Sequence, residues 1–440
     1  MDQIKTKKGS IHGLSMKGYS LFLGIPYAKA PIGPLRWRPP QEVDPWENVY
    51  EATRYPNRSM QDEYTNPFYD KEFYDDPQRN TPFSEDSLYL NVWTPASSPD
   101  EKLPVAFWIH GGAYLGGYGH EKPFDGKAFC DRGVILVTIN YRVGPFGFLA
   151  HPLLSEEDRN LGGCGVSGNY GILDQVAALH WVREHISSFG GDPDRITVLG
   201  QSAGSKSVQI LVSSPLTCGM IAGAIMQSGL GLENESSLSE AEEYGKAFAA
   251  NAGISTLAEM RALSPEAVLN FARPILRQGM QSGKMVFSPN VDDFLLLSDT
   301  ASALKGNATH NIPYMVGSTK NDIRVDPECL TQGDPGPVYR ACLDWGITMK
   351  SIGRSPSYLY YFTRQLPGDS SGAFHSSELW YMFGTLDRCW RPMTAEDYSL
   401  SNHMLDYWCN FIKKGDPNGE GLPKWSPLLS KADIKQFDVL

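Results

Sequence analysis

A serine at position 202 stands between two glycines, in the run Gly200-Gln201-Ser202-Ala203-Gly204. Residues 195–199 before this run predict a strand, and residues 205–213 after it predict a helix. A strand that turns sharply into a helix needs small residues on both sides of the turn, because the chains pass too close for a Cβ. A serine at the apex is held out from the sheet, where its hydroxyl can attack a substrate carbonyl. The pattern therefore predicts acyl transfer with Ser202 as the nucleophile.

A second cluster of small residues, Gly111-Gly112-Ala113, follows an apolar run over 105–109 that predicts another strand. Acyl transfer creates an oxyanion, and preorganised backbone N–H groups stabilise it effectively. We expect an oxyanion hole formed by Gly111, Gly112 and Ala113, completed by the N–H group of Ala203. The histidine directly before this cluster is expected to orient the backbone by hydrogen bonding.

These motifs lie among longer runs that resemble the type-B carboxylesterase/lipase family, which includes bacterial para-nitrobenzyl-type carboxylesterases and the cholinesterases. The resemblance covers nearly the whole chain and rests on several motifs in the correct order. They are the runs at 24–28, 31–40, 84–92, 140–144, 168–175, 408–418 and 423–425. The resemblance implies the α/β-hydrolase fold and hydrolysis of carboxylic esters, with no metal and no cofactor.

The resemblance also implies a catalytic triad in the chain order serine, acid, histidine. Among the histidines of the chain, His375 in the run 372–379 matches the family's catalytic histidine motif and lies where this order requires it. His375 would take the proton of Ser202 as the serine attacks, and would later return it to the leaving alcohol. Ser228 matches a family serine that supports the triad from behind. A loop serine that bonds its own backbone is the alternative for that position.

The acid of the triad departs from the family pattern. Family members carry Gly-x-x-x-x-Glu-Gly after a short strand, which the sequence predicts here over 314–316. In the run 317–323 the acid position is held by Asp322, with isoleucine where the family has glycine. Aspartate can fix the imidazole tautomer and stabilise the imidazolium, but its shorter side chain requires the loop to lie closer. Asp326 and Glu328 are the alternatives.

The elements that must position these residues indicate an α/β protein. We expect a mostly parallel, twisted central sheet with helices on both faces and helical cap excursions. Apolar residues at helical spacing predict a helix over 174–186, just before the strand that leads to the serine. Because motifs of one fold run from beginning to end, residues 1–440 are expected to form a single domain. Residues 237–283 are expected to form a helical cap over the active-site cleft.

Two stretches are expected to shape the entrance to the site. Residues 61–77 mix aromatic with acidic side chains, and by family analogy they form a loop that overhangs the cleft. A solvated acidic loop with a few anchoring aromatics is the alternative. Asp322 and His375 are only 53 positions apart in the sequence, and this short connection predicts a more open cleft than the gorge of cholinesterases.

Cysteine usage and charge bear on compartment and partners. The cysteines are odd in number and scattered, which favours reduced, mostly buried thiols of a cytoplasmic protein. Ser87 stands where secreted relatives carry a disulfide-bonded cysteine. The first residues have no apolar signal core, and no run is long enough to span a membrane. The Asn-x-Ser/Thr sites at Asn57, Asn234 and Asn307 are expected to be chance matches. A net charge of −11 argues against nucleic acid or an anionic membrane as a partner.

The sequence therefore predicts a serine carboxylesterase that acts on small to medium esters. A feruloyl or cinnamoyl esterase is the narrower alternative. Five aromatic residues could line the acyl pocket of such an enzyme, but residues of this kind are more often part of the hydrophobic core. These residues are Tyr114, Tyr118, Phe287, Trp380 and Tyr381. A non-catalytic, cholinesterase-like binding protein is a further class, and acyl transfer to an alcohol or amine would use the same triad. The sequence leaves the oligomeric state open.

Overall fold

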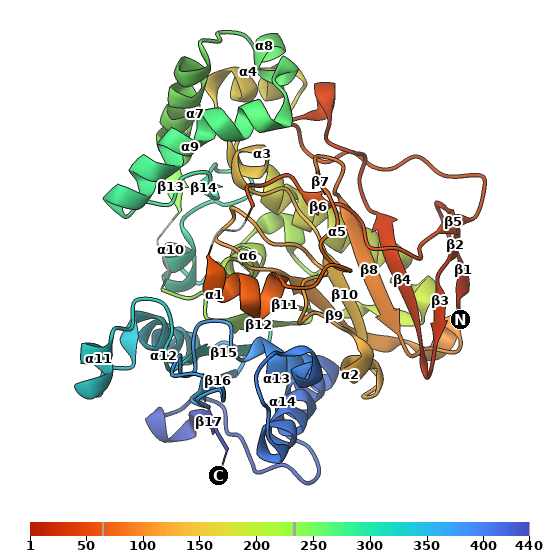
Figure 1. Cartoon of the computed structure of the whole chain (residues 1–440), viewed down its shortest axis with the longest axis vertical. Helices are drawn as coiled ribbons and strands as arrows, with labels where there is room; N and C mark the ends of the chain where they lie inside the picture. The colour runs from red at the N-terminus through yellow and green to blue at the C-terminus, as the bar shows by residue number, and fades with distance from the viewer. Residues whose placement is uncertain (64–65, 232–234, 440) are drawn as a thin grey trace.

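A mixed β-sheet runs through the centre of the computed structural model, which describes residues 1–63, 66–231 and 235–439 (Figure 1). In this part of the chain the sheet has ten strands, and its pairs are parallel from β17 to β10 and antiparallel from β10 to β3. In spatial order the strands are β17 (Lys435–Phe437), β16 (Ser357–Phe362), β15 (Tyr314–Thr319), β12 (Gly223–Gln227), β11 (Gly191–Gln201), β9 (Leu103–Ile109), β10 (Ile135–Ile139), β8 (Tyr89–Thr94), β4 (Tyr19–Pro26) and β3 (Leu14–Met16).

The remaining strands form small sheets outside the central one. They are β1 (Gln3–Thr6), β2 (Gly9–His12), β5 (Tyr50–Glu51), β6 (Arg58–Ser59), β7 (Phe83–Ser84), β13 (Ser236–Ser237) and β14 (Asn290–Val291). The α-helices are α1 (Pro67–Tyr69), α2 (Lys127–Cys130), α3 (Gly144–Phe148), α4 (Pro152–Asn160), α5 (Tyr170–His185), α6 (Ala203–Leu211), α7 (Leu238–Ala252), α8 (Leu257–Ala262), α9 (Pro265–Ser282), α10 (Thr300–Lys305), α11 (Pro327–Thr331), α12 (Gly336–Ser351), α13 (Leu379–Phe383) and α14 (Ala395–Lys414).

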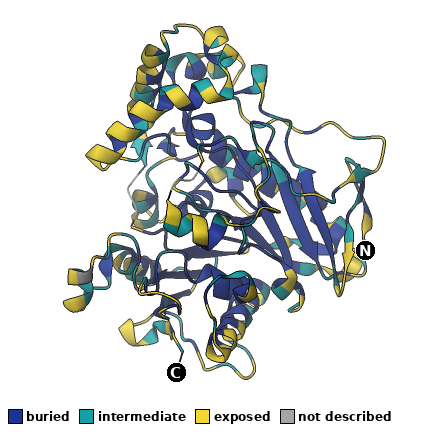
Figure 2. Ribbon diagram, viewed as in Figure 1, coloured by how far each residue is buried: buried dark blue, intermediate teal, exposed yellow. Residues whose placement is uncertain are grey.

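Helices cover both faces of the sheet, because successive side chains of a strand point to opposite sides. On β9, Val105, Phe107 and Ile109 belong to one hydrophobic core, which α5, α6 and α12 complete. Ala106 and Trp108 belong to a second core, which α13 and α14 complete. The central strands are buried on both faces, as Figure 2 shows, and their nearly continuous apolar sequences are typical of parallel sheets. The expected α/β class is confirmed.

The elements around the serine begin earlier than the sequence predicted. The strand expected over 195–199 is the longer β11, and the helix expected over 205–213 is α6, which starts directly after the serine. The helix expected over 174–186 is α5, which starts at Tyr170 and ends at His185. The difference at α6 has a physical reason: Ala203 and Gly204 are small enough to form the first turn against β9, so the chain needs no linker between strand and helix.

Residues 237–283, expected as a cap, form the three helices α7, α8 and α9. Figure 1 shows them in green as a lobe at the top of the molecule, which also includes α4 (yellow-brown). Helices α7 and α9 pack on each other, and α9 also contacts α3. After this lobe the chain returns toward the serine: Met285, Ser288 and Pro289 line the cavity that contains Ser202.

The described part of the 61–77 loop folds into α1 and a π-helical turn over Asp70–Tyr74. Phe73 is buried between the rings of Phe374 and Trp380, with centroid distances of 6.4 and 5.7 Å. Glu72 is 1% exposed and pairs with the fully buried guanidinium of Arg391 at 2.7 Å. These contacts join the loop to the segment that carries His375. Tyr64, one of the aromatics counted for this loop, lies outside the described residues.

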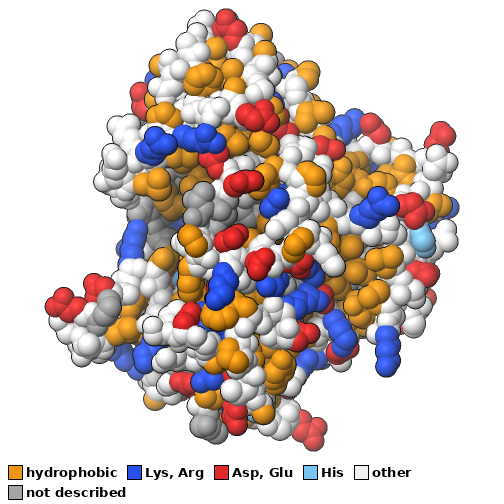
Figure 3. Space-filling view, in the orientation of Figure 1, with side chains coloured by type: hydrophobic (Ala, Val, Ile, Leu, Met, Phe, Trp, Pro, Cys, Tyr) orange, Lys and Arg blue, Asp and Glu red, His pale blue; other side chains and the backbone are white. Residues whose placement is uncertain are grey.

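The surface carries charges of both signs. Figure 3 shows acidic, basic and apolar side chains interspersed over the face that it displays. No helix within the described ranges is long and apolar enough to cross a membrane. The seven cysteines are free, but only Cys130, Cys342 and Cys409 are buried, so the expectation of mostly buried thiols is wrong. The others lie in loops or short helical turns near the surface, where the sheet does not cover them. Asn234 lies outside the described residues.

Candidate active site

Ser202 occupies a strained turn between β11 and α6. Its φ of 57° and ψ of −124° place a residue with a side chain in a region that normally suits glycine. The neighbouring chains leave no room for larger residues, since a Cβ at Gly204 would lie 2.1 Å from the Ile109 carbonyl oxygen. A Cβ at Gly200 would lie 2.5 Å from the Gly204 backbone. The turn thus has the geometry of a nucleophile elbow, and Ser202 is partly exposed at its apex.

His375 and Asp322 come together across the carboxyl-terminal edge of the sheet. His375 Nδ1 lies 2.6 Å from Asp322 Oδ1, and the Asp322 side chain is 1% exposed. The two loops are fastened to each other next to this contact. The Asn321 N–H donates to the Ala373 carbonyl at 2.9 Å, and Asn321 Oδ1 accepts from the Ala373 N–H at 2.9 Å.

The Asp322 carboxylate accepts further hydrogen bonds on both of its oxygens. Ser228 Oγ donates to Oδ2 at 2.7 Å, and the Thr319 N–H donates to the same oxygen at 3.0 Å. The Ile323 N–H donates to Oδ1 at 2.8 Å. Burial opposes the charged carboxylate, but the charge of His375 and these hydrogen bonds outweigh it and lower the pKa of Asp322. Burial likewise opposes the imidazolium, but the Asp322 charge outweighs it and raises the pKa of His375.

The alternative acids lie elsewhere. Asp326 accepts a hydrogen bond from the Cys329 N–H at 2.8 Å and begins α11 as its N-cap. Glu328 is exposed and accepts from the Gln332 side chain at 3.1 Å. Neither carboxylate hydrogen-bonds to His375 in the part of the chain that the structure describes. The short side chain of Asp322 reaches the imidazole because the Asn321–Ala373 contacts hold the two loops together.

The small residues expected as an oxyanion hole lie beside the serine. A Cβ at Gly111 would be 3.1 Å from Ser202 Cβ, and Ala113 and Ala203 line the cavity that contains Ser202. Gly112 has a φ of 102°, and its Cβ would clash with the Gly116 carbonyl at 2.2 Å. The N–H groups of Gly112, Ala113 and Ala203 have no acceptor among the described residues, so they are available to an oxyanion.

The histidine before this loop holds its backbone. His110 Nδ1 donates to the Gly111 carbonyl at 2.9 Å, and its ring stacks on Tyr141 at a centroid distance of 4.3 Å. The Tyr141 hydroxyl donates in turn to the His110 carbonyl at 3.0 Å. Complete burial lowers the pKa of His110 to about 4, which keeps the ring neutral and fixes its role as a donor to the loop.

Sequence reasoning missed the partner of the second imidazole nitrogen. His375 Nε2 lies 3.1 Å from Gln201 Nε2, and no hydrogen bond joins it to Ser202 Oγ within the described residues. Because Nδ1–H faces the Asp322 carboxylate, Nε2 carries the lone pair and accepts from the Gln201 amide. Gln201 Oε1 packs against Gly111, where a Cβ would lie 3.1 Å away. The position directly before the nucleophile was the only sequence signal for this contact.

A second carboxyl group lies close behind the triad. Glu378, three residues after His375, is fully buried and accepts from Gln227 Nε2 at 3.4 Å. Burial and the charge of Asp322 raise the pKa of Glu378 to about 7, although the charge of His375 opposes this shift. Glu378 is thus a second buried carboxyl group within the electrostatic field of the imidazole.

Comparisons with known proteins decide the family. The model of the carboxylesterase family matches residues 1–332 and 343–438. The chain belongs to this family. It is a carboxylic-ester hydrolase, as the resemblance implied.

Named relatives and solved structures agree with this assignment. The chain is 32% identical to the para-nitrobenzyl esterase of Bacillus subtilis, over 95% of this chain and 91% of the relative. It is 31% identical to the fumonisin B1 esterase of Sphingopyxis macrogoltabida, over 98% and 85% of the two chains. A thermophilic para-nitrobenzyl esterase superposes with a TM-score of 0.86 at 29% identity, covering 99% and 96% of the two chains. The Geobacillus stearothermophilus carboxylesterase superposes with a TM-score of 0.81 at 32% identity, over 100% and 96%. The α/β-hydrolase fold is thereby confirmed.

The carboxylesterase has a cavity of about 220 Å³ directly beside Ser202. Its lining includes apolar residues and the charged side chains of Lys206, Glu235 and Arg324. Of the aromatic residues considered for an acyl pocket, Tyr114 lines this cavity. Trp380 and Tyr381 belong instead to the core beneath α14.

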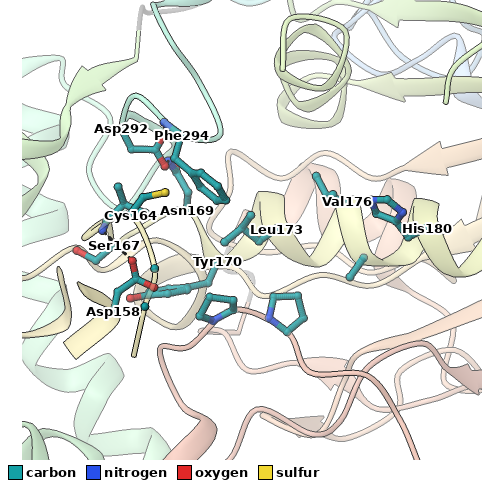
Figure 4. A pocket seen from close by; sticks show the side chains of 16 residues that line it. Asp158, Cys164, Ser167, Asn169, Tyr170, Leu173, Val176, His180, Asp292 and Phe294 are labelled. Carbon is teal, nitrogen blue, oxygen red and sulfur yellow. Dashed lines mark hydrogen bonds between the residues drawn. The ribbon is translucent and has the colours of Figure 1, made fainter. Parts of the chain in front are cut away.

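A larger cavity of about 500 Å³ has a different lining (Figure 4). Figure 4 shows Leu173, Val176 and His180 in a row along α5, with Phe294 near the Leu173 end of the row. None of the residues proposed for catalysis lines it, and its Asp292 side chain already accepts hydrogen bonds from three backbone N–H groups.

Proposed function

We propose that this carboxylesterase hydrolyses small to medium carboxylic esters through a Ser202–His375–Asp322 triad and a covalent acyl-enzyme. The observation that carries the proposal is the 2.6 Å contact between His375 Nδ1 and Asp322 Oδ1, beside a serine on a strained elbow. The carboxylate fixes the imidazole tautomer, and its charge favours the imidazolium that must form during catalysis.

In the proposed reaction, His375 Nε2 takes the proton from Ser202 Oγ as that oxygen attacks the ester carbonyl. The Gln201 amide, 3.1 Å from Nε2 in the structure, must leave this nitrogen before the transfer. The tetrahedral oxyanion accepts hydrogen bonds from the N–H groups of Gly112, Ala113 and Ala203, with Gly111 giving room beside the serine. The imidazolium protonates the leaving alcohol, and the neutral imidazole then activates the water that hydrolyses the acyl-enzyme.

Other parts of the chain have supporting roles in the proposal. Ser228 holds Asp322 in place through its 2.7 Å hydrogen bond. Residues 61–77 and the lobe over 237–283 border the entrance to the site. Residues 1–440 form one domain. The short connection from Asp322 to His375 leaves the cleft open. The cavity of about 220 Å³ is smaller than the roughly 300–1,000 Å³ typical of sites for drug-sized ligands, which favours acyl groups of modest size.

Hydrolysis of para-nitrophenyl esters from acetate to decanoate tests the proposal. We expect activity in the wild type that falls by at least ~10³-fold in Ser202→Ala, with a preference for the shorter chains. Ser205→Ala is the matched control, because Ser205 is buried on the same helix and its hydroxyl has no hydrogen-bond partner among the described residues. A folded wild type without activity would instead favour the non-catalytic binding protein.

The same assay separates the narrower substrates. Only Tyr114 among the five aromatic candidates lines the cavity at Ser202, so we expect methyl ferulate to be hydrolysed no faster than an aliphatic ester of similar size. Fumonisin B1 belongs in the panel, because the Sphingopyxis relative is named for its hydrolysis.

A further inference from the structure

Lys206 brings a charged side chain into the wall of the cavity beside Ser202. It lies one helical turn after Ser202 on α6, and its N–H donates to the Ser202 carbonyl at 3.0 Å. Residues four apart share one face of a helix, so the lysine side chain lies on the side of the nucleophile. Lys206 is only 7% exposed and lines the cavity together with Ser202 and Glu235.

Among the described residues, the ammonium group of Lys206 has fewer acceptors than it has N–H groups. Nζ lies 3.0 Å from Glu235 Oε1 and donates to Thr300 Oγ1 at 2.9 Å. An ammonium group has three N–H donors. These two oxygens are its acceptors within the described residues, so one of its donors has no acceptor in that part of the chain. Glu235, whose side chain is 2% exposed, is held by the Thr300 N–H at 3.0 Å.

An apolar wall would form more readily than this one. Removing an ion pair from water costs free energy that its attraction often fails to recover, and an unpaired buried donor adds to the cost. The rest of the lining includes the uncharged residues Ala113, Met285 and Ile323, and a second basic residue, Arg324. Polar groups in a mostly apolar ligand cavity serve to orient the ligand. The free donor of Lys206 is therefore suited to an acceptor on the substrate.

We propose that the cavity selects esters whose acyl group carries a hydrogen-bond-accepting oxygen, which binds Lys206 Nζ. The proposal rests on the proposed function, because it takes Ser202 as the nucleophile. Four residues of α-helix rise about 6 Å, and helical side chains lean toward the N-terminus. The acceptor is thus expected at about C4 to C6 of the acyl chain, with the attacked carbonyl carbon counted as C1. Keto, hydroxyl and carboxylate oxygens share this chemistry.

Isosteric pairs of para-nitrophenyl esters test the proposal, since a keto oxygen replaces a methyl group of the same size. The pairs are 4-oxopentanoate with 4-methylpentanoate, and 6-oxoheptanoate with 6-methylheptanoate. We expect the wild type to prefer the keto ester by about tenfold or more in kcat/KM in at least one pair, because a site that hydrogen-bonds a substrate group rejects the analogue without it. In Lys206→Met the preference should fall to about onefold. Hydrogen adipate, isosteric with 6-oxoheptanoate, distinguishes a charged from a neutral acceptor.

The matched control is Lys246→Met, which removes a lysine from an exposed ion pair on α7 and should retain the preference. If Lys206→Met does not fold, the double variant Lys206→Met/Glu235→Leu removes the buried pair together and should also lose the preference. Equal rates on both members of each pair, or a preference that survives in the folded variants, would overturn the inference alone. Failure of the wild type on all of these esters, or activity that survives Ser202→Ala, would overturn the proposed function itself.

Discussion

The imidazole of His375 lies between two side chains with opposite effects on its proton. Asp322 Oδ1, 2.6 Å from Nδ1, favours the imidazolium. The amide of Gln201, 3.1 Å from Nε2, donates to the neutral ring and occupies the atom that must take the serine proton. With His375 as the proposed catalytic base, we expect the balance between these contacts to set the pH at which the enzyme becomes active.

The carboxylate side of this balance predicts an acid limb in the pH profile. His375 must be neutral to act as a base, so kcat/KM falls as the pH drops through its pKa, which Asp322 raises above the ordinary value. In Asp322→Asn we expect the acid limb to move to lower pH and kcat to fall by about 10⁴-fold, because the tautomer is lost. A pH series with para-nitrophenyl acetate measures both quantities. An unmoved limb would contradict the pairing of Asp322 with His375.

The contact with the Gln201 amide predicts that a carboxylate at this position shifts the acid limb to higher pH. In Gln201→Glu a carboxylate would face Nε2 and favour the imidazolium, so the acid limb should move to higher pH. Gln201→Met, which keeps the length but removes the donor to the neutral ring, should leave Nε2 open to Ser202 and move the acid limb upward by less than Gln201→Glu does. Comparison of the two pH profiles of kcat/KM isolates the electrostatic effect from packing. Identical profiles for the two variants would show that Gln201 does not contact the working imidazole.

At the scale of the elements, backbone strain gathers on the loops around the site. Ser202, Ala113, Tyr114, Ser228 and Arg324 all have positive φ values between 51° and 61°. Such conformations persist only where the surrounding structure holds them. Here the sheet holds them: β11 and β12 end directly before Ser202 and Ser228, and the loops that carry the other three residues follow β9 and β15.

The sequence revealed the elements of this arrangement better than the contacts between them. Glycines and apolar runs predicted the strand, turn and helix at Ser202, since those signals are local. The partner of Asp322 depended on the Asn321–Ala373 contacts, which join residues 52 positions apart. The anchoring of Glu72 by Arg391 spans 319 positions, and no local pattern could indicate it. Glu378 and Lys206 likewise lie within predicted helices or motifs, but their burial follows from tertiary packing.

The buried Glu72–Arg391 pair predicts that the 61–77 loop is part of the stable fold. Glu72→Gln removes one of the two carboxylates that pair with the buried Arg391 and leaves Asp369 at 2.8 Å, so we expect a loss of stability below the about 3–5 kcal/mol of a fully broken buried pair. We expect a clear drop in the thermal midpoint and lower kcat/KM, because the loop packs on Phe374 beside His375. Glu243→Gln, in the exposed pair with Lys246, is the control and should change the midpoint little. Equal midpoints in the two variants would contradict the anchoring role.

At the scale of the whole molecule, an ion pair joins the upper lobe to the start of the 61–77 loop. Arg273 of α9 lies 2.7 Å from Asp62, with both side chains more than two-fifths exposed. This pair links the two segments that are expected to border the site, while the two hydrophobic cores hold the sheet between its helical layers.

Charge reversal tests that link. In Arg273→Asp two carboxylates repel, so we expect faster proteolysis within 61–77, and the swap Arg273→Asp/Asp62→Arg should restore the original rate. The difference should shrink at 1 M salt, where charges are screened over about 3 Å. Limited proteolysis followed by mass spectrometry measures it. Acceleration that persists in the swap would show that shape, rather than charge, joins the two segments.

The central claim, that Ser202 becomes acylated, is tested most directly by trapping the covalent intermediate. The enzyme is mixed with a large excess of a para-nitrophenyl ester, quenched in acid within milliseconds, digested and mapped by mass spectrometry. We predict a burst of about one para-nitrophenol per active site if deacylation is slower than acylation, with the added acyl mass on the peptide that contains Ser202. An acyl group found reproducibly on another residue, or a burst that persists in Ser202→Ala, would contradict the account.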